Sequence, residues 1–290
     1  MTPEKVQQLP AASENIDPQT VEGFGQEWAA YDQTDMPADE YERLFQCYFS
    51  IFPFDSLPPT AEGFDLGCGS GRWAAGVARR VAKLNCIDPS EQALDVARAA
   101  LMKLDNVEFH LAAADQIPLA PASQDFGYSL GVLHHVPNTA RALSDCVTKL
   151  KPGAPFLVYL YYAFDNRPVW FRSLWQLSDA VRKLIYPLPF RARRAATSAL
   201  AITIYWPLAR AAWLAERMGA DVENFPLSAY RSLSLYTMRT DSLDRFGTRL
   251  EQRFSKVQIE QMMTAAGLID IRFSDGLPYW VACGRKGSAG

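Results

Sequence analysis

The sequence predicts an α/β fold, in which a mainly parallel sheet is covered by helices and carries a large helical insertion. Three observations predict it. A short apolar run at 62–66 passes through a glycine-rich turn into a helix-compatible stretch. Strand-like and helix-like segments then alternate up to residue 162. Finally, about 90 residues lie between the fifth strand and the last helix, too many for a bare loop.

Length and composition limit the class of protein to which the chain can belong. The chain has 290 residues, 49% of them hydrophobic, which is enough for one large core and an elaborate insertion. No apolar run approaches the roughly 18 residues of a membrane-spanning helix, and the N-terminus lacks the pattern of a signal peptide. Five scattered cysteines without paired spacing favour a reduced, cytoplasmic protein with neither disulfides nor a zinc site.

The N-terminal part divides in two. Residues 1–20 are polar and contain three prolines, so we expect a loose leader. Residues 21–54 are rich in aromatic side chains with helical spacing, so we expect one or two helices packed ahead of the sheet.

The first strand leads into a turn in which Gly67, Gly69 and Gly71 follow Asp65 at every second position. Glycine accepts positive φ and lets a ligand approach the backbone closely. The helix that follows, expected at 72–83, offers free N–H groups to an electron-rich part of such a ligand. The spacing is neither that of the dinucleotide fingerprint nor that of a P-loop. A purely structural turn remains the alternative.

Strands are expected at 84–88, 107–111, 125–130 and 155–161, with helices at 90–103 and 137–150 between them. Ser90 can cap the first of these helices and Pro137 can begin the second. Asp88 ends the second strand, where an ionised carboxylate can accept both hydroxyls of a ribose. The alternative for Asp88 is a solvated acid in a turn.

Five motifs occur in order: Asp65-x-Gly67-x-Gly69-x-Gly71, Asp88 after strand two, Asp115 after strand three, G-V-L-H-H-V at 131–136 and K-P-G at 151–153. Together they resemble class I S-adenosylmethionine (SAM) dependent methyltransferases, in particular the methyltransferase type 11 and ubiquinone/menaquinone methyltransferase-like group, over 60–162 and 255–285. The resemblance implies a Rossmann-like, seven-stranded, mainly parallel sheet with a C-terminal antiparallel hairpin. That hairpin would pair 268–275 with 278–285 through Asp275 and Gly276, after a last helix at 256–267.

The resemblance also implies SAM as cofactor and S-adenosylhomocysteine (SAH) as product, with no metal. The glycine turn would hold the methionine part, Asp88 the ribose and Asp115 the adenine amino group. Residues 24–28 would fold over the cofactor, or else pack on the side of the domain. The predicted cofactor-binding residues are Asp65, Gly67, Cys68, Gly69, Gly71, Arg72, Asp88, Pro89, Ser90, Ala114, Asp115, Gln116, Leu130, Gly131 and His135.

Candidate catalytic residues follow strands four and five. Methyl transfer to a hydroxyl or an acidic carbon needs a base, and an imidazole titrates near neutrality. His135 is the first candidate, His134 the alternate, and Tyr161 a third; cofactor stacking or helix capping is the other interpretation of either histidine. By strand alternation Tyr159 and Tyr161 share one face and Tyr162 takes the other. Substrate candidates are Trp28, Tyr159, Tyr162, Arg167 and Arg245.

The stretch 163–254 is predicted to form a helical lid over the strand ends, with helices at 168–185, 191–218 and within 230–250. Residues 163–250 hold 13 arginines and lysines against 7 aspartates and glutamates, although the whole chain has a formal net charge of −3. Basic residues interleaved with aromatic ones suit an anionic membrane, or a substrate with phosphate and apolar parts. The alternative is an ordinary helical subdomain with a solvated basic face.

Two further features of the chain's charge are informative. A pI near 5.7 and the lack of a recognisable nucleic-acid module argue against a nucleic-acid partner. The dense alternating charges at 241–254 are interpreted as a structural ion-pair network first, and as a closure of the lid second.

We therefore expect four parts: an N-terminal leader with covering helices (1–58), a SAM-binding core (59–162), the helical insertion (163–254) and the completion of the core (255–290). The expected function is methyl transfer to an O or C atom of a small or lipid-linked acceptor, such as a cell-envelope glycolipid, isoprenoid or quinone precursor. The expected place is the cytoplasm, with peripheral contact at the inner membrane face. The alternatives are methylation of a soluble secondary metabolite, and a SAM- or SAH-binding regulatory or assembly protein without activity.

Overall fold

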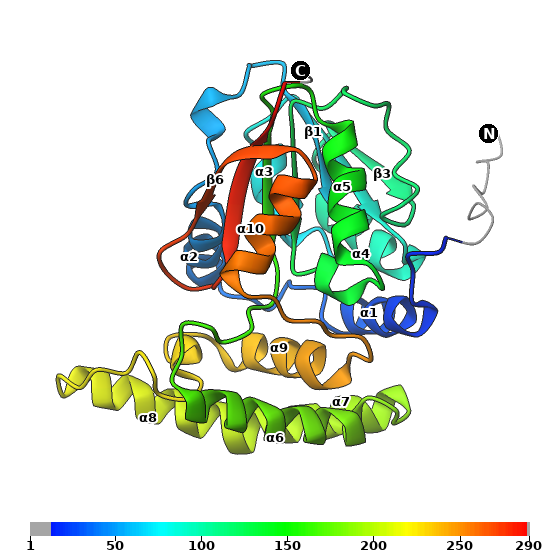
Figure 1. Ribbon diagram of the computed structural model, residues 1–290. Helices are drawn as coiled ribbons and strands as arrows, with labels where there is room; N and C mark the ends of the chain where they lie inside the picture. Colours follow the sequence, from blue (N-terminus) through cyan, green and yellow to red (C-terminus); the bar gives the residue numbers. More distant parts are fainter. Residues whose placement is uncertain (1–12, 289–290) are drawn as a thin grey trace.

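The computed structural model describes residues 13–288, so the first part of the predicted leader lies outside the described residues. Its centre is one seven-stranded sheet with the strand order β3-β2-β1-β4-β5-β7-β6 (Figure 1). Only β7 runs antiparallel to its neighbours, and the other pairs are parallel. The strands are β1 (Glu62–Leu66), β2 (Lys83–Asp88), β3 (Val107–Leu111), β4 (Phe126–Leu130), β5 (Pro155–Tyr159), β6 (Leu268–Phe273) and β7 (Val281–Lys286). The predicted fold class is confirmed.

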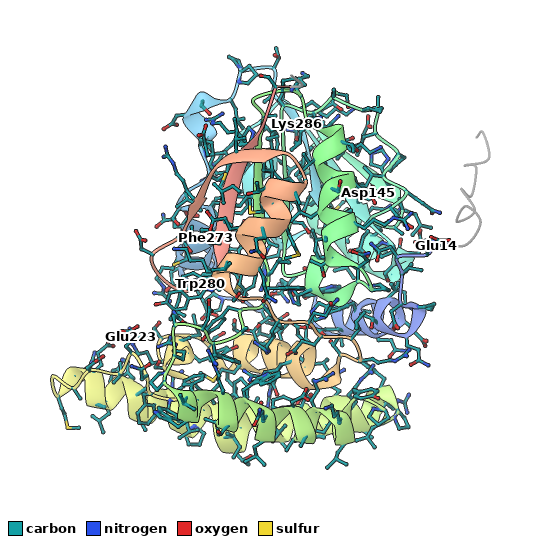
Figure 2. All side chains as sticks on the ribbon, viewed as in Figure 1. Glu14, Asp145, Glu223, Phe273, Trp280 and Lys286 are labelled. Atoms are coloured by element: carbon teal, nitrogen blue, oxygen red, sulfur yellow. The ribbon has the colours of Figure 1, made fainter. Side chains whose placement is uncertain are left out.

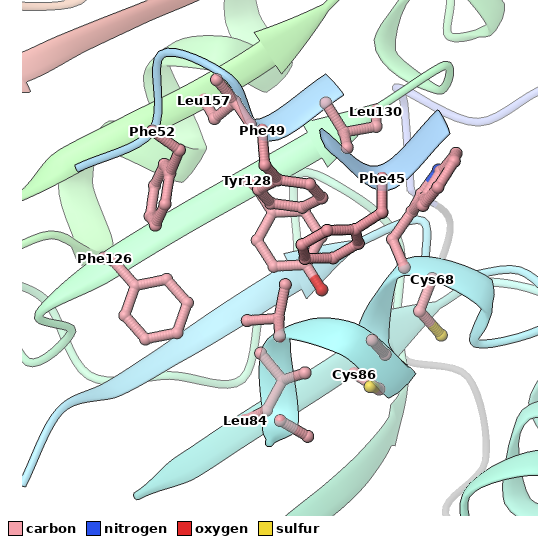
Figure 3. Close-up of a cluster of buried hydrophobic side chains, with 14 of the residues drawn as sticks. Phe45, Phe49, Phe52, Cys68, Leu84, Cys86, Phe126, Tyr128, Leu130 and Leu157 are labelled. Carbon is pink, nitrogen blue, oxygen red and sulfur yellow. The ribbon is translucent and has the colours of Figure 1, made fainter. Parts of the chain in front are cut away.

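Helices cover both faces of the sheet. One face carries α5 (Thr139–Lys149) and α10 (Lys256–Ala265), which bury Leu143 and Ile259. The other face carries α2 (Ala38–Phe49), α3 (Arg72–Ala78) and α4 (Glu91–Leu101). There Phe45 and Phe49 of α2 pack with Phe52 against the buried ring of Tyr128 (Figure 3). The aromatic stretch of the N-terminal part therefore completes the core on this face.

Several predicted helix boundaries differ from the structure, and for two of them a side-chain hydrogen bond gives the reason. Helix α3 ends at Ala78 instead of residue 83, because the Asn106 side chain donates to the carbonyls of Ala78 (2.8 Å) and Val81 (3.0 Å) as the chain turns toward β2. Helix α5 begins at Thr139 instead of residue 137, because the Asn138 side chain caps it by accepting from Arg141 N–H at 3.0 Å.

The connection between β6 and β7 also differs from the expectation of a tight turn through Asp275 and Gly276. The last hydrogen bond at this end of the pair runs from the Ser274 N–H to the Val281 carbonyl, at 2.9 Å. Beyond it the two strands separate, and residues 275–280 form a longer loop. Trp280 in this loop donates its indole N–H to Asp165 at 3.0 Å, where the chain passes from the core into the insertion (Figure 2).

The insertion between β5 and α10 is helical, as predicted. It contains α6 (Val169–Ile185), α7 (Phe190–Leu200), a π-helical turn (Ala201–Tyr205), α8 (Trp206–Arg217) and α9 (Leu235–Gly247). Pro207 lacks the N–H that would continue the α-helical pattern, which accounts for a π-turn directly before it. Helix α9 lies between the core and an outer layer formed by α6, α7 and α8 (Figure 1). The insertion therefore covers the edge of the sheet at which the parallel strands end.

Candidate active site

The turn after β1 requires glycine. Gly67, Gly69 and Gly71 all have positive φ, at 75°, 53° and 77°. A Cβ atom at Gly67 would lie 2.4 Å from the Val132 side chain, and one at Gly69 would lie 2.8 Å from the indole nitrogen of Trp28. The turn therefore has no room for side chains, and Trp28 lies directly against it.

Asp88 lies beside this turn at the end of β2 and is only 8% exposed. One carboxylate oxygen accepts the Gly69 N–H at 3.0 Å, and the other accepts the Ser90 N–H at 2.9 Å. Burial raises the pKa of Asp88 to about 6, although both N–H bonds oppose the shift. The group is therefore ionised at neutral pH, and each oxygen keeps a lone pair with which it can accept a ribose hydroxyl.

A cavity opens between this turn and α1 (Pro18–Ala30), and most of the predicted cofactor residues line it. Helix α1 supplies Thr20, Val21, Phe24 and Trp28 to the opposite wall, so the segment 24–28 covers the predicted cofactor position. The predicted residues in the wall are Gly67, Cys68, Gly69, Arg72, Asp88, Pro89, Ser90, Leu130, Gly131 and His135.

The remaining predicted cofactor residues, Asp65, Gly71, Ala114, Asp115 and Gln116, do not line the cavity. Asp65 is buried, and its burial raises its pKa to about 8. Asp115 accepts a hydrogen bond from the Ser13 hydroxyl at 2.6 Å. The predicted contacts of these residues with the cofactor therefore stay predictions.

His135 is the catalytic candidate that reaches the cavity. Its ring is 4% exposed, and Nδ1 lies 2.6 Å from the Leu250 carbonyl oxygen. Because a carbonyl only accepts hydrogen bonds, Nδ1 carries the proton and Nε2 is an acceptor. Nε2 has no hydrogen-bond partner within residues 13–288. Burial lowers the pKa of His135 to about 4, so the imidazole is neutral at pH 7 and available as a base.

His134 and Tyr161 lie behind His135, away from the cavity wall. The His134 ring is fully buried and stacks on Tyr161 with 3.8 Å between ring centroids. Tyr161 donates its hydroxyl to Asp244 at 2.5 Å, and burial raises the pKa of Tyr161 well above its usual value. The phenol proton is therefore held by Asp244, and the role of Tyr161 as a base stays a prediction.

The predicted substrate residues are dispersed. Trp28 lines the cavity. Tyr159 packs edge-on against Tyr48, and Tyr162 contacts Tyr279. Strand β5 ends at Tyr159, so the predicted alternation does not extend to Tyr161 and Tyr162. Arg167 donates to the Glu223 carbonyl at 2.6 Å, while Arg245 turns into the insertion. Apart from Trp28, these side chains do not line the cavity.

Sequence reasoning missed a group of acidic side chains between α1 and α9. Asp241 and Asp244 project from α9, and burial raises the pKa of each to about 6. Glu27 of α1 is also buried; burial, followed by repulsion from Asp244 and Asp241, raises its pKa. Arg72 of the cavity wall partly offsets these charges. The charge run at 241–254 was the only sign of this group in the sequence.

Among the described residues, no group of three or more His, Cys, Asp or Glu side chains is arranged to hold a metal ion. What the site offers is a glycine turn, a buried carboxylate at the end of β2 and a neutral imidazole in one cavity wall. The sheet order and the reversed β7 are those that the resemblance to SAM-dependent methyltransferases implied.

Comparison with known proteins identifies the family of one part of the chain. Residues 64–158 match the family model described as "Methyltransferase domain". This part of the chain is therefore a methyltransferase domain, and the resemblance that the five motifs indicated is confirmed.

Two curated relatives match part of the same region. A ubiquinone biosynthesis O-methyltransferase from Azoarcus sp. (strain BH72) is 37% identical over 91 residues, which are 31% of this chain and 39% of the relative. An O-methyltransferase from Pyrenophora dematioidea is 35% identical over 94 residues, 31% of this chain and 35% of the relative. The matched region thus spans well under half the length of these relatives.

Among solved structures, the S-adenosylmethionine-dependent methyltransferase SibL in its apo form is similar with a TM-score of 0.50. The sequence identity is 14%, over 86% of this chain and 57% of that chain. This likeness concerns the fold alone.

Proposed function

We propose that the whole chain is a SAM-dependent methyltransferase that transfers a methyl group to a hydroxyl oxygen of a small or lipid-linked acceptor. The observation that carries the proposal is the state of His135. His135 lines the cavity that the glycine turn and Asp88 form. Its Nδ1–H is held by the Leu250 carbonyl, and its buried Nε2 has no hydrogen-bond partner among the described residues.

In this proposal each part of the cavity wall has its own role. SAM supplies a methyl group on a positively charged sulfur, which is already activated for transfer. Asp88 holds the ribose, and the glycine turn holds the methionine part. Phe24 and Trp28 of α1 exclude water from the cavity. His135 Nε2 takes the proton of the acceptor hydroxyl, and the Leu250 carbonyl keeps the ring oriented.

The names of the relatives support oxygen, rather than carbon, as the methylated atom, because both are O-methyltransferases. The first relative also supports a quinone-type acceptor. A soluble secondary metabolite is the alternative acceptor.

The test begins with calorimetry of SAM and SAH binding, followed by SAH release in the presence of acceptor pools. His135→Gln should lower the turnover by about 100-fold or more, because a positioned general base contributes that much, and should leave SAM affinity nearly unchanged. His110→Gln is the matched control, since His110 bonds to Asn85 on β2 and lies outside the cavity wall. If the wild-type protein binds SAM but none of the acceptor pools leads to SAH release, the result would favour the non-catalytic alternative.

Peripheral contact with an anionic membrane is the second part of the proposal. In the described part of the chain no helix is long and apolar enough to cross a membrane. The outer layer nevertheless exposes many large apolar side chains, which a water-facing surface rarely gathers. They are Val169, Trp170, Leu174, Leu177, Leu184, Leu188, Ile202, Ile204, Trp206, Leu214 and Met218.

The charges of the same layer complement anionic lipid. Arg172, Lys183, Arg191 and Arg194 are exposed, while the acid on α6, Asp179, is already paired with Lys183 at 2.8 Å. Basic and apolar side chains on one surface favour binding in the headgroup region of an anionic bilayer. Such contact would bring the protein to a lipid-linked acceptor at the cytoplasmic face.

Vesicle sedimentation tests this part. Leu177 and Leu184 lie seven positions apart on one face of α6, 65% and 74% exposed. Replacing both by Gln should reduce binding to phosphatidylglycerol-containing vesicles at least 10-fold, since burying two leucines stabilises binding by roughly 3 kcal/mol. The control is Met102→Gln, at a 76% exposed side chain on the core. Equal sedimentation of both variants and the wild type would exclude the outer layer as the membrane contact.

A further inference from the structure

The segment that follows α9 contains the carbonyl that orients the His135 ring. Helix α9 ends at Gly247, and the Leu250 carbonyl, in the segment after it, accepts the His135 Nδ1–H at 2.6 Å. The Leu250 side chain takes no part in this hydrogen bond, so the course of the main chain at 248–250 decides whether the carbonyl faces the ring. The contacts that fix this main chain therefore also fix which nitrogen of His135 carries the proton.

The core fixes the chain after Leu250. Gln252 donates its main-chain N–H to the His134 carbonyl at 3.0 Å. Its side-chain amide donates to the Val136 carbonyl at 2.7 Å. Both bonds reach main-chain oxygens next to His135, so the chain after Leu250 is tied directly to the segment that carries the proposed base.

Arg182 of α6 fixes the chain before Leu250. Its Nη1 donates to the Thr248 carbonyl at 2.8 Å and to the Arg249 carbonyl at 2.9 Å. The Arg182 side chain is only 10% exposed, so these bonds are largely shielded from water. The Arg249 side chain adds an ion pair with Asp17 at 3.1 Å, but it is 48% exposed, and exposed ion pairs contribute little.

The guanidinium of Arg182 is itself held in one orientation. Nε donates to Asp179 Oδ1 at 2.8 Å, and Nη2 lies 2.8 Å from the same oxygen. Because a planar guanidinium presents its N–H groups in a fixed fork, Asp179 on one side sets the direction of Nη1 on the other. Helix α6 belongs to the outer layer (Figure 1), so this layer reaches through Arg182 to the main chain beside His135.

We propose that Arg182 is a positioning residue for methyl transfer. By holding the carbonyls of Thr248 and Arg249, it places the Leu250 carbonyl against His135 Nδ1 and leaves Nε2 as the proton acceptor. A purely structural role, in which Arg182 satisfies the carbonyls at the end of α9, would stabilise the insertion without acting on the ring. The inference rests on the proposed function and adds to it a residue that does not line the cavity.

The test replaces Arg182 by methionine, which keeps a long side chain and leaves Asp179 paired with Lys183. Nitrogen NMR of the SAH-bound protein with isotope-labelled histidine shows which ring nitrogen of His135 carries the proton, and His135→Gln identifies the signals. Wild-type protein should carry it on Nδ1. In Arg182→Met the share of the form protonated on Nε2 should rise about 3- to 10-fold, as expected when one hydrogen bond is weakened.

The same variant should lose turnover while it keeps the cofactor. SAH release with the acceptor pools should fall about 10-fold or more, since misplacing a reacting group by about 1 Å can cost about 100-fold. SAM affinity in calorimetry should stay nearly unchanged, because Arg182 lies outside the cavity wall.

Arg210→Met is the matched control. Arg210 of α8 also donates to two main-chain carbonyls, those of Arg231 and Leu233, each at 2.8 Å. These residues precede α9, at the end opposite to the Arg182 contact. The control should lower the free energy of unfolding as well, but it should leave the His135 proton on Nδ1 and the turnover as in wild type.

An Arg182→Met protein that keeps the wild-type protonation of His135, or changes it no more than Arg210→Met does, would overturn the proposal. If Arg182→Met does not fold, Arg182→Lys decides by the same criterion, because lysine keeps the charge but cannot bind Asp179 and both carbonyls in one plane. Full turnover of His135→Gln contradicts the proposed function itself. An unaltered His135 ring in the Arg182 variants contradicts this inference alone.

Discussion

Replacing Gly25 by alanine tests how α1 closes the cofactor cavity. Gly25 is buried where α1 crosses the start of α4. A Cβ atom there would lie 2.5 Å from the Ser90 hydroxyl oxygen and 2.9 Å from Gln92 Oε1. The Gln92 side chain can move, but the Ser90 side chain cannot move freely, because it caps α4 by accepting the Ala93 N–H. The substitution therefore pushes α1 away from the cavity.

Gly23 provides a matched control in the same helix, since a Cβ at this position would meet nothing closer than 3.9 Å. Both substitutions gain about 1 kcal/mol of helix propensity. Overpacking at position 25 costs about 1–3 kcal/mol. Gly25→Ala should therefore be less stable than Gly23→Ala by that amount, and its affinity for SAM should fall because Phe24 and Trp28 move with the helix.

Urea unfolding gives the two free energies of unfolding, and calorimetry gives the SAM affinities. Equal stability and equal affinity of the two variants would refute the reasoning, because they would mean that α1 does not press on Ser90. Reduced stability with unchanged affinity would confine the role of the contact to packing.

Three further predictions concern single side chains. Asp88→Ala should weaken SAM binding at least 100-fold in calorimetry, since two hydrogen bonds to a charged group are lost; unchanged affinity would mean that the ribose binds elsewhere. Burial raises the pKa of Asp241 from its ordinary 3.8 to about 6, so the folded state retains a proton that the unfolded state releases, and this stabilisation is lost as the pH rises through 6. Asp241→Asn should accordingly gain up to about 3 kcal/mol in urea unfolding relative to wild type between pH 4 and pH 7, and a constant difference would contradict the assignment. His134→Phe should keep the free energy of unfolding within about 1 kcal/mol, because neither ring nitrogen has a partner in the described chain; a large loss of turnover would make His134 the base.

The sheet and the cofactor side of the site could be predicted because their determinants are local. The glycine turn, Asp88 and the Ser90 cap lie within 25 residues of one another, and their roles follow from backbone conformation and charge. Element ends were less predictable. Helix α3 ends where the side chain of Asn106, 28 residues further along the chain, donates to the Ala78 carbonyl. The residues around Ala78 give no sign of this helix end.

The acceptor side could not be predicted in the same way, because it depends on how the insertion packs. Asp244 reaches His135 across more than 100 residues of chain, and only the docking of α9 brings them within 3.6 Å. The sequence shows the charges at 241–254, but their partners are spread over the core: Arg249, for example, binds Asp17 at the start of α1.

The hydrogen bond from His135 to Leu250 ends on a main-chain oxygen. Every residue type at position 250 has this carbonyl oxygen, so the contact does not require a leucine and the sequence alone does not reveal it. What it does depend on is length: a one-residue deletion between α9 and α10 would carry the carbonyl away from the ring and free the imidazole to change tautomer. Excising the insertion would remove Leu250 and have the same effect, so the core alone would not hold the His135 ring in this orientation even though it contains the whole glycine turn.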